Sequence, residues 1–155
     1  MTTAVIDTSV VVALADTHDK WHVHAVALRD ALLASGIRQL YFDCVINEAI
    51  GVIGRRTEEQ RRSEQFERLL DGVLLLIPAQ AITWISGAGE RLFPETLALC
   101  REHQGKLNYH DALMALACRE LDIRLIVSFD GDFDGIAWLT RVLEPVSISR
   151  LANNP

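Results

Sequence analysis

Short apolar runs alternate along the chain with longer segments whose apolar residues recur at helical spacing, and this alternation restricts the possible folds more than any other feature. Strands that are separated by helices pair in parallel, as βαβ units. A run as continuously apolar as Val73–Ile77 is typical of a sheet covered by helices on both faces. The sequence therefore predicts a three-layer α/β/α fold with a parallel five-stranded sheet. The runs expected to form its strands are Val5–Ile6, Gln39–Phe42, Val73–Ile77, Arg124–Val127 and Val142–Leu143.

The segments between these runs carry signals for helix starts and ends. Gly36 ends the second expected helix, because glycine readily adopts the left-handed conformation that follows a helix C-terminus. Asp43 and Asn108 are residue types whose side chains cap helix N-termini. We expect a break near Phe93–Pro94, because proline disrupts a helix interior. The expected helices are Ser9–Ala15, Lys20–Ala34, Asp43–Arg56, Glu58–Leu70, two within Ala79–Gln104, and Tyr109–Leu121.

Length and cysteine content indicate the general class of the chain. Its 155 residues are typical of one domain, so we expect a single domain over residues 1–155. No apolar run reaches the roughly 18–20 residues that span a bilayer, and we expect no membrane association. Cys44, Cys100 and Cys118 are odd in number and lack a CxxC spacing, which argues against a disulfide framework or a zinc site. We therefore expect a reducing compartment and a cytoplasmic protein.

The formal net charge of −6 argues against a protein that binds nucleic acid tightly through a basic surface. Net charge is a property of the whole surface, however. A cluster of carboxylates that binds divalent cations presents local positive charge to a phosphate group. Metal-dependent phosphate chemistry therefore stays open.

Four acidic residues fall at or near the ends of expected elements: Asp7, Glu48, Asp111 and Asp130. Asp7 follows the first strand and Asp130 the fourth, and ligands of an open parallel sheet bind beyond the carboxyl ends of its strands. Glu48 can reach that edge from the helix after the second strand, and Asp111 joins if its apolar helix begins there. Each acid alone also has an ordinary explanation as a helix-start, turn or ion-paired residue. Converging carboxylates repel each other unless cations neutralise them, and hard oxygen ligands select Mg²⁺ or Mn²⁺.

The loop Ser128–Gly135 contains three aspartates in a D-x-D-x-D-G pattern, which matches the start of an EF-hand calcium loop. The twelfth position of such a loop requires a glutamate, but here it is Arg141, and the preceding segment is strand-like. We therefore reject a calcium site. Asp130 is expected to be a metal ligand, Asp132 an auxiliary ligand or a turn-former, and Asp134 a solvated cap.

Two further groups of residues are candidates for contact with a phosphate-containing substrate. Ser9 and Ser128 lie near the expected crevice, where their hydroxyls could bind phosphate or a ligand carboxylate, although local capping also explains them. Arg55 and Arg56 begin a dense basic stretch that continues to Arg62 and could follow a nucleic-acid backbone. Glutamates interleave with these arginines, so an exposed helix of mixed charge is the alternative.

Four motifs contain the acidic residues in order along the chain. They are Val5-Ile-Asp-Thr-Ser-Val, Asn47-Glu48, Tyr109-His-Asp-Ala-Leu-Met-Ala and Ile126-Val-Ser-Phe-Asp-Gly-Asp-Phe. Together they resemble the motifs of the PIN-domain family, and most closely those of its small VapC-type toxins from bacterial toxin–antitoxin pairs. The resemblance implies the strand order 3-2-1-4-5 and cleavage of single-stranded RNA by the four acids with Mg²⁺ or Mn²⁺. It also implies a homodimer and an antitoxin protein as partner.

Two other functions stay open at this point. A magnesium-dependent phosphohydrolase for small phosphomonoesters would use the same ions, but the haloacid-dehalogenase type needs a second aspartate two residues after the first. Here Asp7 is followed by Thr8 and Ser9. A PIN-like module that only binds a partner, without catalysis, is the other alternative.

Overall fold

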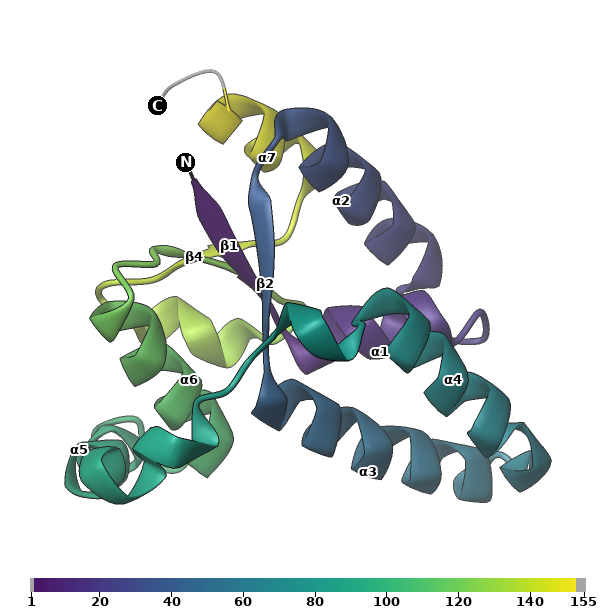
Figure 1. Ribbon diagram of the computed structural model, residues 1–155, viewed down its shortest axis with the longest axis horizontal. Helices are drawn as coiled ribbons and strands as arrows, with labels where there is room; N and C mark the ends of the chain where they lie inside the picture. The colour runs from purple at the N-terminus through teal and green to yellow at the C-terminus, as the bar shows by residue number, and fades with distance from the viewer. Residues whose placement is uncertain (1, 153–155) are drawn as a thin grey trace.

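The structure is a computed structural model that describes residues 2–152. The strands in this part of the chain are β1 (Thr3–Ile6), β2 (Arg38–Phe42), β3 (Ile82–Thr83), β4 (Leu125–Val127) and β5 (Thr140–Val142). The helices are α1 (Thr8–Ala15), α2 (His22–Ser35), α3 (Asp43–Glu59), α4 (Phe66–Leu76), α5 (Gly89–Glu102), α6 (Tyr109–Glu120) and α7 (Pro145–Ala152). All strand pairs are parallel and the order is β3-β2-β1-β4-β5, which confirms the predicted fold class and the order 3-2-1-4-5. Figure 1 shows α5 and α6 on one side of the strands and α1, α3 and α4 on the other.

The central strand, β1, determines where the site lies. It pairs with β2 along one edge and with β4 along the other. The register places Ile6 opposite Val127, so the next residues, Asp7 and Ser128, leave the sheet side by side. A hydrogen bond from the Asp7 N–H to the Val127 carbonyl (3.0 Å) continues the ladder by one step. Two side chains 121 residues apart in the chain are thereby placed at one point of the sheet edge.

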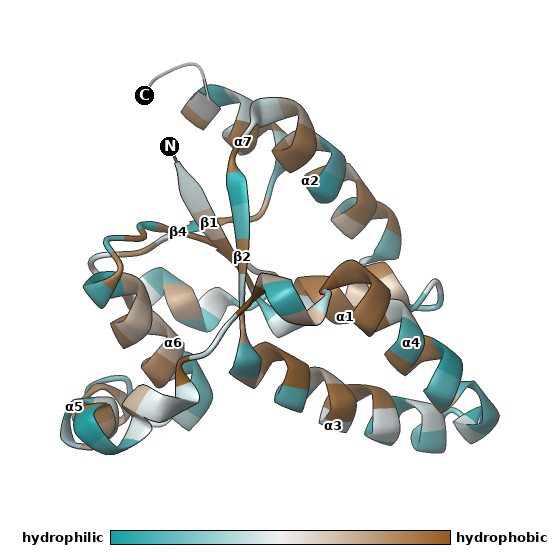
Figure 2. Cartoon of the chain, in the orientation of Figure 1, coloured by the Kyte–Doolittle hydropathy of each residue, from teal (hydrophilic) through white to brown (hydrophobic). Residues whose placement is uncertain are grey.

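Helix α1 follows β1 directly and is buried. Residues Val10–Ala13 are at most 2% exposed, and Figure 2 shows α1 coloured hydrophobic along most of its length. A helix that is apolar on all sides is a buried helix, and α1 packs against α2, α3 and α4. This packing fixes the N-terminus of α1, and with it Asp7, at the carboxyl end of β1.

The predicted third strand is wrong. Most of Val73–Ile77 belongs to helix α4, in which Leu69 and Val73 are buried one turn apart while Leu75 is 86% exposed. The third strand is instead the short segment Ile82–Thr83. A short apolar run fits a buried strand or one face of a helix equally well, and here the helix's tertiary contacts decided between them. The expected helix Glu58–Leu70 is likewise divided, because α3 continues to Glu59 and the chain then turns before α4 begins.

Helix α5 runs through Pro94 without the predicted break. Leu92, Thr96 and Leu99 form a buried face that continues past the proline, whereas Pro94 itself is exposed. The backbone hydrogen bond lost at Pro94 therefore lies on the side where water can replace it, and packing of the buried face keeps the helix continuous.

Of the two expected N-caps, Asn108 is confirmed and Asp43 is not. Asn108 caps α6, because its side-chain oxygen accepts the Asp111 N–H at 2.9 Å, as predicted. Asp43 does not cap α3 but is its first residue. Its carboxylate instead accepts the N–H groups of Ile85 (2.8 Å) and Ser86 (3.2 Å), and so joins the start of α3 to the segment that follows β3. Burial acts to raise the pKa of Asp43, but these hydrogen bonds bring it below its ordinary value.

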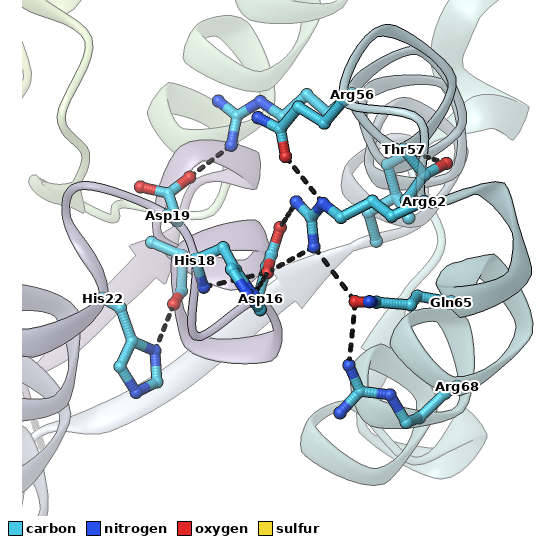
Figure 3. A network of polar contacts seen from close by, with 12 residues as sticks. Asp16, His18, Asp19, His22, Arg56, Thr57, Arg62, Gln65 and Arg68 are labelled. Carbon is cyan, nitrogen blue, oxygen red and sulfur yellow. Dashed lines mark hydrogen bonds and ion pairs between the residues drawn. The ribbon is translucent and has the colours of Figure 1, made fainter.

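A buried ion pair joins the end of α1 to the turn between α3 and α4. Both nitrogens of the Arg62 guanidinium fork donate to the two carboxylate oxygens of Asp16, with 3.0 Å between Nη1 and Oδ1. Asp16 also accepts the His18 N–H, and Arg62 also donates to Gln60 and Gln65. Figure 3 shows Arg62 between Asp16 and Gln65 at the centre of this network. Burial acts to raise the pKa of Asp16, but the hydrogen bonds from Arg62 and His18 and the charge of Arg62 lower it below its ordinary value.

The cysteines and the helices bear on the expected class of the chain. All three cysteines are free thiols, and Cys44 and Cys118 are buried. Burial raises the pKa of both buried thiols to about 12, so they are protonated at neutral pH. Over residues 2–152, no helix combines the length and the apolar character that crossing a membrane would require.

Candidate active site

The four predicted acids line one cavity of about 120 Å³ at the carboxyl ends of β1 and β4. Asp7 comes from the start of α1, Glu48 from α3, Asp111 from the start of α6, and Asp130 from the segment after β4. The other lining residues are Thr8, Ser9, Val12, Val52 and Arg56. Helix α6 does begin at this edge, which was the condition for Asp111 to join. A second cavity of about 390 Å³ beside Arg124 and Thr140 lies at the amino ends of β4 and β5 and contains none of these acids.

Asp7 is buried and is held by hydroxyl groups. Its Oδ2 accepts hydrogen bonds from Ser9 Oγ (2.6 Å) and Ser128 Oγ (2.7 Å), and it caps α1 through the Ser9 N–H (3.3 Å). Burial raises the pKa of Asp7 above its ordinary value, although these hydrogen bonds act to lower it. Of the two partners considered for Ser9 and Ser128, the structure shows a carboxylate of the acidic cluster, and Ser128 also has the local role considered for it, since its Oγ accepts the Asp130 N–H (2.9 Å).

Glu48 is oriented by a residue that the sequence analysis did not single out. Thr8 Oγ1 donates to Glu48 Oε2 at 2.8 Å, and Thr8 is buried. The two residues are 40 positions apart in the chain, so only the packing of α1 against α3 brings them together. The single sequence signal for Thr8 is its place between Asp7 and Ser9 in the first motif.

Asp111 lies in the first turn of α6, where its carboxylate completes a capping box with Asn108. Oxygens of Asp7, Glu48 and Asp111 lie within 4.8 Å of one another. Burial, and next the negative charges of Asp7 and Glu48, raise the pKa of Asp111 to about 7. At neutral pH the fold therefore holds a carboxylate that is only partly ionised unless a cation is added.

Asp130 lies at the carboxylate cavity, whereas Asp132 does not. Asp130 lines the cavity, and its charge contributes to the raised pKa of Asp111, but it is not one of the three acids within 4.8 Å. Its Oδ1 accepts the Asp132 N–H (2.9 Å) at the start of the short turn Gly131–Gly135. Asp132 is half-buried and does not line the cavity, so the structure favours the turn-forming role that we considered for it. Asp134 forms an ion pair with Arg141 and is not simply a solvated cap.

The two predicted arginines also differ. Arg56 lines the cavity, where it forms an ion pair with Asp19 (Figure 3). Arg55 is exposed and lines the neighbouring groove together with Asn47 and Tyr109. The basic stretch therefore does not act as one surface, since Arg62 at its end is buried in the pair with Asp16.

The donor set of the cavity fits a hard divalent cation. Four carboxylates face one arginine that is already paired, which leaves a negative excess in a cavity where Asp7 and Asp111 are buried and Asp130 is exposed. The hydrogen bonds of Asp7, Glu48 and Asp130 with other residues fall on one oxygen of each carboxylate. The second oxygen of each is available to a ligand, and oxygen donors of this kind suit Mg²⁺ or Mn²⁺.

Replacing Asp111 with asparagine is expected to stabilise the metal-free protein at neutral pH. A carboxylate whose pKa is higher in the folded state than in the unfolded state destabilises the fold when it ionises. The loss of stability therefore develops as the pH rises from 3.8, the ordinary pKa of the group, through about 7, its pKa in the folded protein. The full shift corresponds to about 4 kcal/mol, and relaxation of the site reduces this, so we expect a gain of about 2 kcal/mol at pH 8. The asparagine oxygen can still accept the Asn108 N–H.

Thermal unfolding in EDTA at pH 5 and pH 8 measures this effect. A gain of about 2 kcal/mol raises the melting temperature by roughly 4–8 °C at pH 8, with a smaller rise at pH 5. Added Mg²⁺ should stabilise the wild type and reduce the difference. Asp71→Asn makes the same change on the exposed side of α4 and should leave the melting temperature unchanged. An Asp111→Asn variant that melts at or below the wild-type temperature at pH 8 in EDTA would contradict the expectation.

Comparison with known proteins agrees with this geometry. The PIN-domain family model matches residues 4–139, which is most of the chain, so the chain belongs to the PIN-domain family. Two solved structures share its fold. VapC20 of Mycobacterium tuberculosis, described as a toxin that cleaves the sarcin-ricin loop, has 19% identity and a TM-score of 0.65, covering 88% of this chain and 96% of its own. PAE2754 of Pyrobaculum aerophilum has 19% identity and a TM-score of 0.60, covering 99% and 91%. No curated protein matched the chain in sequence.

Proposed function

We propose that this protein is a metal-dependent ribonuclease that cleaves phosphodiester bonds of single-stranded RNA. The observation that carries the proposal is the cavity in which Asp7, Glu48, Asp111 and Asp130 converge in a PIN-domain chain. A divalent ion beside the attacked phosphate can activate water and stabilise the developing charge, and this cavity has the donor set to hold one.

The residues of the cavity divide into ligands and residues that hold them. Asp7, Asp111 and Asp130 would hold the ion, with Glu48 as a further ligand or as a group that positions water. A bound Mg²⁺ or Mn²⁺ would supply activation of water and stabilisation of charge on the phosphate. Ser9, Ser128 and Thr8 fix two of the carboxylates by the hydrogen bonds described above, and Asn108 anchors the start of α6.

We further propose that the protein is the toxin of a toxin–antitoxin pair, active in the cytoplasm as a homodimer and inhibited by an antitoxin protein. The support is the shared fold with VapC20, which is described as a toxin that cleaves the sarcin-ricin loop. A gene for a small DNA-binding protein directly upstream would support this part of the proposal. Its absence, together with a protein that does not slow growth when expressed, would favour a nuclease with another role.

An assay with two substrates tests the enzymatic part. The purified protein is incubated with single-stranded RNA or with p-nitrophenyl phosphate, in Mg²⁺, in Mn²⁺ and in EDTA. We expect RNA cleavage with either ion, none in EDTA, and no release of p-nitrophenol. Phosphomonoester hydrolysis without RNA cleavage would identify a phosphohydrolase instead. Inactivity on both substrates would leave the non-catalytic binding module.

A further inference from the structure

A groove leads away from the carboxylate cavity between α3 and α6. The cavity shares Glu48 and Val52 with a neighbouring hollow of about 340 Å³. That hollow in turn shares Asn47, Tyr109 and His110 with a third pocket of about 250 Å³. We call this third space the α3–α6 pocket. The shared residues place the three spaces next to one another along α3 and the start of α6, so a chain-like ligand with one phosphate at the carboxylates can extend towards the pocket.

The walls of the α3–α6 pocket are apolar and fixed. Ile85 and Leu113 are buried side chains that line it. The Asp43 carboxylate holds the backbone of Ile85 and Ser86 against the start of α3, so this wall is tied to the same helix that carries Glu48. Such a pocket does not need to form on binding, so no entropic cost is paid for ordering its walls.

The rim of the pocket is aromatic and polar. The rings of Tyr109 and His110 lie edge to face with centroids 5.8 Å apart. Within residues 2–152, the side chains of Asn47, Tyr109 and His110 take part in no hydrogen bond with another residue, so their polar atoms are available to a ligand. A side-chain amide offers a donor and an acceptor in one plane, which is the arrangement that pairs with the edge of a nucleobase. Aromatic rings offer faces and edges for stacking with it.

Charge also favours a neutral, planar ligand over a charged one. The Cys44 thiol in the wall stays protonated because burial raises its pKa to about 12, and the Asp43 carboxylate is taken up by backbone N–H groups. The middle part of the groove carries Arg55, which is exposed and forms no ion pair within the described residues. The order along the groove is therefore carboxylates, a cation, and a pocket whose one carboxylate is bound by backbone N–H groups. This order matches a scissile phosphate, a neighbouring phosphate and a base.

We propose that the α3–α6 pocket binds one nucleobase of the RNA beside the cleaved phosphodiester, and that Asn47 and the pocket walls set the base preference of cleavage. The proposal rests on the proposed ribonuclease function and adds a specificity site to it. Asn47 is a specificity-determining residue in this scheme, and the carboxylates keep their role.

Sequencing of cleavage ends tests the pocket. The wild type and its variants are incubated with Mg²⁺ and a pool of random single-stranded RNA, and the bases around each cut are read. We expect the wild type to prefer one base at a fixed position next to the cut. Asn47→Ala removes the amide and should weaken that preference about tenfold. Gly89→Leu places a side chain in the pocket, since even a Cβ at Gly89 would contact the Tyr109 hydroxyl at 3.5 Å.

Two matched controls make the same changes outside the groove. Gln80→Ala removes an exposed amide, and Gly87→Leu adds a side chain where nothing lies within 4 Å of the Cβ position. Both should keep the wild-type preference. The rise in melting temperature on addition of Mg²⁺ shows for each variant that the fold and the metal site are intact.

The outcomes separate the two proposals. A wild type that leaves the pool uncut overturns the ribonuclease function. Cutting without a base preference, or with a preference that survives both pocket substitutions, overturns the pocket assignment alone. In that case the pocket would accept another ligand, such as a side chain of a protein partner. Loss of the preference in both pocket variants, with both controls unchanged, supports the assignment.

Discussion

Replacing Asp7 with asparagine is expected to reduce RNA cleavage at least about a thousandfold, because a metal ion contributes several kcal/mol to stabilisation of the transition state. Asparagine loses the negative charge that attracts the ion, but it keeps a side-chain oxygen. That oxygen can still accept the hydrogen bonds of Ser9 and Ser128, which both fall on Oδ2. The variant should therefore fold, and its defect should lie in metal binding and catalysis.

Cleavage rates under single-turnover conditions, measured over a range of Mg²⁺ concentrations, test this prediction. The loss should persist at saturating RNA, and the rise in melting temperature on addition of Mg²⁺ should be weaker than in the wild type. Asp71→Asn, an exposed carboxylate of α4, is the matched control and should cleave at the wild-type rate. Wild-type activity of a folded Asp7→Asn variant would remove Asp7 from the mechanism and with it the central part of the proposed site.

Replacing Arg62 with alanine is expected to lower the free energy of unfolding by about 3–5 kcal/mol, because it leaves the Asp16 carboxylate buried without its partner. Asp16 ends α1, and the pair is what connects that end to the turn before α4. In the variant, the hydrogen bonds and charge of Arg62 no longer offset the burial of Asp16, and only the contacts with His18 still act to lower its pKa, so that pKa should rise. The difference in the free energy of unfolding between the wild type and the variant should therefore shrink as the pH falls and Asp16 becomes protonated.

Urea unfolding at pH 7 and at pH 4 measures this effect, with the double variant Asp16→Ala/Arg62→Ala as the key comparison. Removing both partners leaves no unpaired charge, so the double variant should be more stable than Arg62→Ala alone. Arg91→Ala breaks the exposed pair with Glu120 and should hardly change the unfolding midpoint. If the double variant loses as much stability as Asp16→Ala and Arg62→Ala lose together, the two residues do not act as a pair, and the buried ion pair is not the cause of the loss in Arg62→Ala.

The sequence-based predictions succeeded where a local pattern determines the structure. Asn108 was recognised as a cap because its contact lies three residues away, and the four acids that line the cavity were singled out because each stands at or near the end of an expected element. The predictions failed where the packing of one element against another decides the local structure. Val73–Ile77 fits a strand or a helix until its partners are known, and Pro94 is tolerated because the buried face of α5 continues past it.

Contacts between distant residues account for what the sequence analysis missed. Thr8 reaches Glu48 across 40 positions, and Arg62 reaches Asp16 across 46. The basic stretch looked like one surface in the sequence, yet its arginines have three different environments. A single amino-acid sequence does not identify such contact partners, because the contact depends on how α1 packs against α3 and α4.

By itself, the sequence determined the class of fold and the four acids that the fold would have to bring together, since these follow from periodicity and from residue types at or near element ends. The tertiary structure alone decided that the acids meet in one cavity and that hydroxyl groups hold two of them. It also decided that Asp132 stays outside the cavity and that two further hollows adjoin it along α3 and α6. The physical reason is that parallel pairing of β1 with β4 and the packing of α1, α3 and α6 against the sheet place residues more than a hundred positions apart within hydrogen-bond distance.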